Sequence, residues 1–115
     1  MCRVGLYSIA SNGDGTLVAS TANDTTLFAA ASTAYTKSWS VAYAKVSGQR
    51  YAIGVLVVSS VTVPTIIAAL LNTATEPAID PRLSGSLGAQ SDLPSSFTSA
   101  SVAAASSRPY AAVLP

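Results

Sequence analysis

A long stretch without a charged residue, from Tyr51 to Thr75, most constrains how this chain can fold. It holds two dense apolar runs, Ile53 to Val58 and Ile66 to Leu71, separated by a more polar segment. Apolar surface of this extent is removed from water, either by the rest of the protein or by lipid. The stretch exceeds the roughly 20 residues that a helix needs to cross a bilayer.

The membrane interpretation is a single span near 51–72. Its flanks agree with that interpretation, because interfacial aromatic residues and basic residues precede it: Trp39, Tyr43, Tyr51, Lys37, Lys45 and Arg50. By the positive-inside rule, the N-terminal half would then lie inside. The objection is that Ser59 to Thr65, with Pro64, would lie at mid-membrane, where polar groups cost most.

A water-soluble strand followed by a helix accounts for the same polar segment. Here Ile53 to Val58 forms a buried strand, Thr62 caps a helix, Pro64 occupies its first turn, and Ile66 to Leu71 is its buried face. Periodicity does not decide between short apolar runs. We prefer the soluble interpretation and keep the membrane span as the alternative.

The N-terminal region predicts a β-hairpin. Ser11 to Gly15 reads Ser-Asn-Gly-Asp-Gly, a dense turn signal between the strand-like segments Arg3 to Ala10 and Thr16 to Thr21. Asn-Gly and Asp-Gly supply the positive φ angles that tight hairpin turns require.

Residues 24–46 fit two interpretations. As a helix, Asp24 or Thr25 caps the start, large side chains fall on one face at three- and four-residue spacing, and Ser47-Gly48 ends it. As strands, Ala34-Tyr35-Thr36-Lys37 and its echo at Ala42 to Lys45, eight residues on, share one face. The strand would then turn at 47–49 into a second strand from Tyr51 to Val58.

The predicted fold class is therefore α+β: an N-terminal β-hairpin, central strands with one or two helices, and an extended C-terminal tail. We expect a compact α+β domain over 1–75. Residues 76–115 are rich in Ser, Ala and Pro and predict an extended tail packed on the domain or on a partner.

The residue types that catalysis and metal binding most often use are scarce in this chain, which excludes most catalytic and metal sites. There is no histidine, which removes the commonest general base and metal ligand. Cys2 is the single cysteine, so neither an internal disulfide nor a Cys-based zinc site is expected. The carboxylates are scattered, and Gly13-Asp14-Gly15 lacks the rest of a phosphate-binding fingerprint. We expect no enzyme activity, no catalytic or metal site and no cofactor.

One stripe of side chains suits single-stranded RNA. On a strand, lysines would neutralise phosphates and aromatic rings would stack on bases. The candidate RNA-contact residues are Tyr35, Lys37, Trp39, Tyr43, Lys45 and Arg50. On an amphipathic helix the same aromatics would be core, and that use of aromatic stripes is the more frequent one.

The chain resembles the coat proteins of single-stranded RNA bacteriophages. The similarity rests on the Asn12 to Gly15 hairpin, Ser20-Thr21-Ala22-Asn23, Val46-Ser47-Gly48-Gln49 leading into an alternating strand, and Ala68-Ala69-Leu70-Leu71. The resemblance implies an RNA-facing sheet followed by interlocking helices, and a location in the virion or cytoplasm. Strands that normally lie between the central hairpin and the helices are missing, and the tail after residue 76 is extra.

Low charge leads to the functional prediction. Half the residues are hydrophobic and 10% are charged, against about a quarter charged in typical domains. A surface this poor in charge suits a protein covered by copies of itself or by other subunits. We predict a non-enzymatic structural or assembly subunit, coat-like and self-associating, with RNA contact; a single-span membrane accessory subunit is the alternative.

Overall fold

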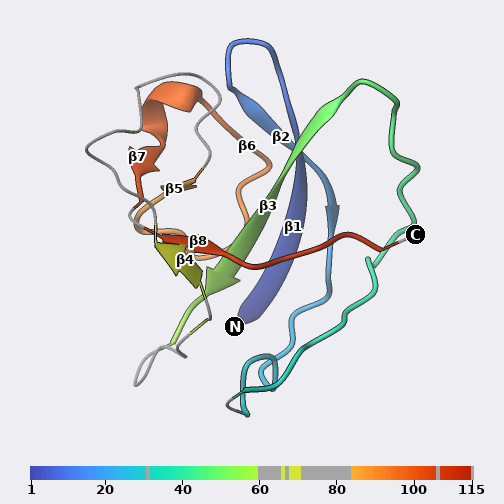
Figure 1. Ribbon diagram of the computed structural model, residues 1–115, viewed down its shortest axis with the longest axis vertical. Coiled ribbons are helices and arrows are strands. Elements are labelled where there is room, and N and C mark those ends of the chain that lie inside the picture. Colours follow the sequence, from blue (N-terminus) through green and yellow to red (C-terminus); the bar gives the residue numbers. More distant parts are fainter. Residues whose placement is uncertain (31, 60–65, 67, 71–83, 106, 115) are drawn as a thin grey trace.

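The computed structural model describes residues 1–30, 32–59, 66, 68–70, 84–105 and 107–114. A curled antiparallel sheet of order β3-β1-β2-β6 forms its centre (Figure 1). Its strands are β1 (Cys2–Ile9), β2 (Gly15–Ser20), β3 (Arg50–Val57) and β6 (Ser96–Phe97). Two smaller pairs are β4 (Ala68–Leu70) with β8 (Ser107–Pro109), and β5 (Gly85–Ser86) with β7 (Ala103–Ala104); η1 (Ser99–Ser101) is a 3-10 turn.

The predicted N-terminal hairpin is confirmed. β1 and β2 pair antiparallel, with a register shift after Leu6 that marks a bulge. The turn closes through two backbone bonds, from Ala10 N to Asp14 O at 2.9 Å and from Gly13 N to Ala10 O at 3.0 Å. Gly13 has φ 87°, the left-handed geometry that the turn sequence was expected to supply.

The strand predicted at 53–58 is also present, as β3. It pairs with β1 along its whole length, from Cys2 opposite Val57 to Ile9 opposite Arg50. Gly48, with φ 78°, turns the chain into it. The local hairpin between residues 35–45 and this strand, considered above, does not form. β3 pairs with the N-terminal strand β1 instead.

The helix considered for residues 24–46 is wrong for the part of that segment that the structure describes. Asp24 does cap a turn, since its Oδ1 accepts from Thr26 N at 2.8 Å. The turn stops at Phe28, whose φ is 69°, and Ser32 has φ 55°. Two left-handed residues so close together end any right-handed helix, and the chain continues as irregular backbone.

The α+β class is likewise wrong. Nothing among the described residues is α-helical. Ala68–Leu70 is strand β4. The sequence had suggested a helix at these residues, which also carried part of the resemblance to the coat proteins. Thr62 and Pro64, the expected cap and first turn, lie outside the described residues, as does the expected boundary at 75/76. The described chain is almost entirely sheet and connecting loops.

The proposed membrane span begins in β3 rather than in a helix. Residues 51–57, the start of that span, belong to the extended strand paired to β1. Within the described ranges, no helix has the length and apolar character needed to cross a bilayer.

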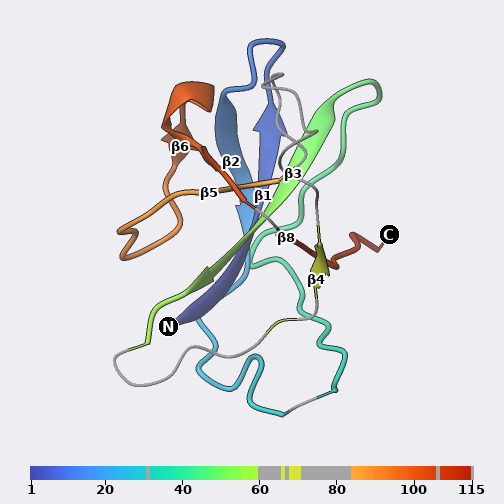
Figure 2. The same cartoon turned by 60° about the vertical axis from the view of Figure 1, so that its left-hand side comes forward.

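The two faces of the sheet carry different cover. Successive residues of a strand point to opposite faces, so Arg3, Gly5 and Tyr7 lie on one face and Cys2, Val4 and Leu6 on the other. Figure 2 shows β5, and β6 at the far edge of the sheet, on one side of β1 and β3, and the loop segments 24–30 and 32–46 toward the other. Among the described residues the core is small: its most buried side chain is Leu6, at 1% exposure, and Tyr7 and Leu27 follow at 4% each.

Candidate functional site

Two of the candidate RNA-contact residues are held inside their own loop. The Tyr35 hydroxyl accepts from Ala30 N at 2.6 Å, and its ring stands edge-on to Phe28 at 5.7 Å. Lys37 forms an ion pair with Asp24. The hydrogen bond from Lys37, assisted by Thr26, holds the pKa of the Asp24 carboxyl far below its ordinary value. The positive charge of Lys37 is thus already compensated.

Tyr43 and Arg50 attach the loop to the sheet. The Tyr43 and Tyr51 hydroxyls lie 3.2 Å apart, and Tyr51 also accepts from Val46 N at 2.9 Å. The hydrogen bond to Tyr51 raises the pKa of the Tyr43 phenol. Arg50 donates through Nη2 to Ala10 O at 3.1 Å, at the hairpin end of β3.

The other two candidates are less constrained. Trp39 is half-buried and Lys45 is exposed. In the described part of the chain, none of the six forms a hydrogen bond, ion pair or ring contact with another of the six. They lie along an irregular loop and the start of β3 rather than on two aligned strands.

A polar cluster that the sequence analysis missed is centred on Arg3. Its guanidinium is bonded on every side: Nε donates to Thr21 O at 3.1 Å, Nη2 to Ser20 Oγ at 2.9 Å, and Nη1 to both carboxylate oxygens of Asp92 at 2.7 and 2.8 Å. The Leu93 backbone N–H and then Arg3 lower the pKa of Asp92. The cluster joins the first strand to a segment almost ninety positions later.

That later segment, residues 92–99, is a strap across one face of the hairpin. Leu17 N donates to Ser95 O at 2.9 Å, and the buried Tyr7 hydroxyl donates to Pro94 O at 3.0 Å. Burial, and secondly the charge of Asp92, raises the pKa of Tyr7. At the far end, Asp14 Oδ1 accepts from Ser99 N at 2.8 Å.

Two glycines of the hairpin form sockets for the strap. A Cβ built on Gly15 would overlap the ring of Phe97, and one built on Gly5 would lie 3.1 Å from Leu93 Cδ1. Phe97 also packs on Tyr7, with ring centroids 5.2 Å apart. Leu93 and Phe97 are the only large apolar residues between Gly88 and Val102. Their isolation in a polar segment could have marked them as residues that pack on the domain. Nothing in the nearby sequence indicated that they would pack on Gly5 and Gly15.

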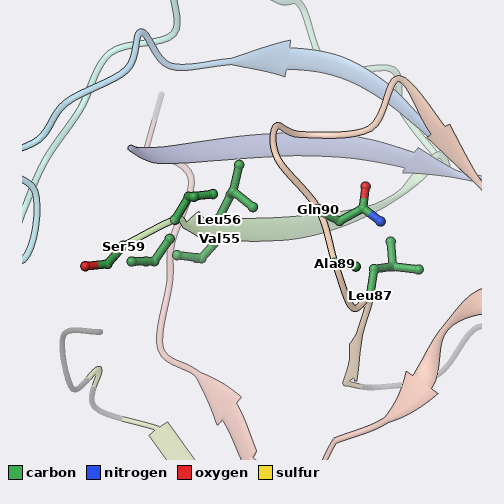
Figure 3. Close-up of a pocket in the computed structure, with 8 residues that line it drawn as sticks. Val55, Leu56, Ser59, Leu87, Ala89 and Gln90 are labelled. Carbon is green, nitrogen blue, oxygen red and sulfur yellow. The ribbon is translucent and has the colours of Figure 1, made fainter. Parts of the chain in front are cut away.

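A groove lies between the C-terminal end of β3 and the loop before the strap (Figure 3). Its volume is about 360 Å³, and it is open to solvent. Gln90 donates to Gly88 O at 3.0 Å and so ties the loop together. The lining residues are Val55, Leu56, Val57, Val58, Ser59, Leu87, Ala89 and Gln90. None of them is charged, so the groove offers backbone groups and apolar side chains.

The described residues offer no metal site. No group of three or more Cys, Asp or Glu side chains gathers among them. Cys2 is buried in β1. The side chains that line the groove include no Asp, Glu, Lys, Arg, Cys or Tyr.

Comparison with known proteins finds no relative. No protein-family model, no curated protein and no solved structure matches this chain.

Proposed function

We propose that this chain is a non-enzymatic structural subunit that associates with copies of itself. The proposal rests on the outer edge of β3. This strand has eight residues and lies at the end of the central sheet, and no described strand pairs with its far side.

The pairing with β1 identifies which peptide groups face outward. Met1 and Val58 exchange two hydrogen bonds, from Met1 N to Val58 O at 2.7 Å and from Val58 N to Met1 O at 2.8 Å. Hydrogen-bonded and non-bonded pairs alternate along an antiparallel ladder. Leu56, Gly54 and Ala52 therefore point their peptide groups at β1. The peptide groups directed away from β1 are those of Tyr51, Ile53, Val55 and Val57.

An edge of this kind favours association. Proteins that remain monomeric usually protect such edges with charges, proline, bulges or short strands. β3 carries one charge, Arg50 at its start, and no proline. The apolar side chains of β3 are half-buried, and large apolar side chains are exposed on the neighbouring loop, including Val41 at 76% and Val46 at 61%. With only 10% charged residues, the surface does little to keep copies apart.

The charged groups add support for a structural role. Lys37 is paired with Asp24 and Arg3 with Asp92, so these four charges serve to hold loops. The coat-like form of the proposal adds RNA as a second partner, and its support is the exposed Lys45 together with the half-buried Trp39.

A proline substitution tests the edge. Val55→Pro removes an outward N–H donor and keeps the inward bonds of Gly54 and Leu56, the position at which edge strands tolerate proline. We expect the parent chain to sediment as an oligomer at micromolar concentration and Val55→Pro to shift toward monomer. Val55→Ala is the matched control, since it changes the side chain and keeps the N–H.

Circular dichroism and a thermal melt report whether each variant keeps the sheet. A parent chain that sediments as a monomer at every concentration tested would contradict the proposal. So would an oligomer that Val55→Pro leaves as stable as Val55→Ala does.

A further inference from the structure

We propose that the C-terminal arm, residues 110–114, of one copy adds as a strand to the outer edge of β3 in the next copy and fills the groove there. The inference rests on the self-association proposed above and names the segment that carries it.

The groove has the parts of a strand-addition site. Its β3 wall includes Val55 and Val57, whose peptide groups point away from β1. Main-chain bonds to such an edge provide affinity, while pockets for alternate side chains provide specificity. Leu56 and Leu87 supply apolar surface beside the edge. An extended, uncharged peptide is therefore the occupant that the groove suits.

The arm has the matching chemistry. It reads Tyr-Ala-Ala-Val-Leu and carries no charged side chain. Tyr110 is 85% exposed and Leu114 is 70% exposed. Residues 110–114 belong to no strand or helix of the described structure. The free energy of two large side chains that are exposed to water, one at each end of the arm, falls when they move into a partner's groove.

The lengths of arm and groove agree. On this side the groove is lined by residues 55–59, which are the last three residues of β3 and the two that follow, and residues 110–114 of the arm match them in length. In a strand, five residues extend about 17 Å. The arm can therefore lie along the whole β3 side of the groove.

The arm of a copy points away from its own groove. Figures 1 and 2 both show the C-terminus on the side of the molecule opposite the loop 87–90. Donation thus runs from one copy to the next, and donor and acceptor surfaces differ. Such donation closes either reciprocally, as in a two-fold dimer that exchanges its arms, or head-to-tail, as in a ring or an open filament.

Chemical cross-linking between two different variants tests the contact directly. Leu87→Cys places a thiol on the groove and Ala112→Cys places one on the arm; the parent chain, whose Cys2 is buried, is the control. A short bismaleimide should join the two chains when the variants are mixed, with peptides containing positions 87 and 112 linked. Each variant alone lacks one of the two thiols, so it reports only cross-links between like positions or to Cys2. No 87–112 link in an oligomeric mixture would overturn the inference.

Serine substitutions on the arm separate this inference from the proposed function. Tyr110→Ser with Leu114→Ser removes both large apolar side chains and should raise the dissociation constant of the assembly at least about tenfold. Ala111→Ser with Ala112→Ser is the control, because it also introduces two serines into the arm. It should change the dissociation constant of the assembly by less than about threefold.

Analytical ultracentrifugation distinguishes the outcomes. If the parent chain assembles and the Tyr110/Leu114 variant assembles equally well, the arm is not the donor while self-association stands. If the parent chain is a monomer, both ideas fail.

Discussion

Gly15→Ala tests the packing of the strap on the hairpin, because it adds a single methyl group where Phe97 lies. The Cβ would overlap the Phe97 ring, which also packs on Tyr7. Gly15 does not have a positive φ, so alanine carries no backbone strain there. Overpacking of this kind costs about 1–3 kcal/mol. We expect Gly15→Ala to lower the free energy of unfolding by about 2 kcal/mol. The Phe97 ring is half-buried, and it can move away from the new methyl group only by disturbing β6, which pairs with β2 through two residue pairs.

A double-mutant cycle with Phe97→Ala isolates that contact. Phe97→Ala alone should cost about 2 kcal/mol, below the 3–5 kcal/mol of a fully buried phenylalanine. With the ring gone, Gly15→Ala should become neutral or stabilising by about 0.5 kcal/mol, since alanine is favoured over glycine in a strand. The expected coupling energy is therefore about 2 kcal/mol.

Urea unfolding followed by circular dichroism measures all four chains of the cycle. The slope of free energy against urea should stay constant across them, which licenses comparison of midpoints. If Gly15→Ala changes the free energy of unfolding equally with and without the Phe97 ring, the ring does not occupy the space beside Gly15 and the reasoning is refuted. A stabilising Gly15→Ala in the parent chain would refute it more directly.

The folded structure lowers the pKa of the Asp92 carboxyl. The stability that the ionised carboxylate contributes is therefore fully present above the ordinary pKa of about 3.9, and it is lost as the pH falls through the lower pKa of the folded state. Asp92→Asn should therefore unfold at lower urea at neutral pH and lose part of the parent's acid sensitivity; urea midpoints against pH measure both, and an unchanged midpoint at neutral pH would contradict the role of the Arg3–Asp92 pair. For RNA, Lys45→Ala should weaken binding to a single-stranded oligonucleotide and reduce the salt slope by about one, while Lys37→Ala changes binding less because Asp24 already compensates its charge. Fluorescence anisotropy at several salt concentrations checks this, and equal affinity for the parent and a chain with both lysines replaced would exclude the predicted RNA surface.

Local turn chemistry was predictable from the sequence. The hairpin follows from residues 11–15, where Gly13 takes the positive φ that only small residues adopt cheaply. The strand β3 follows from an alternating, β-branched run after Gly48. In both cases the sequence signal lies within a few residues along the chain, although the pairing partner of β3 is the distant strand β1.

The loop 24–46 was not predictable in the same way. Its aromatic residues repeat at helical spacing, yet Phe28 and Ser32 adopt left-handed backbone geometry that no local pattern announced. What holds the loop is distant or irregular: Lys37 reaches back to Asp24, and Tyr43 meets Tyr51 of β3. Spacing along the chain does not report such contacts.

By itself, the sequence predicted the N-terminal hairpin, and it favoured the strand after Gly48 over a membrane span without deciding between them. Only the tertiary structure decided that β3 joins β1 at a sheet edge, and that Leu93 and Phe97 pack over Gly5 and Gly15. The physical reason is range. Turn and strand propensities act between near neighbours, whereas a glycine becomes a socket, and an edge becomes a docking site, only when residues far apart in sequence meet.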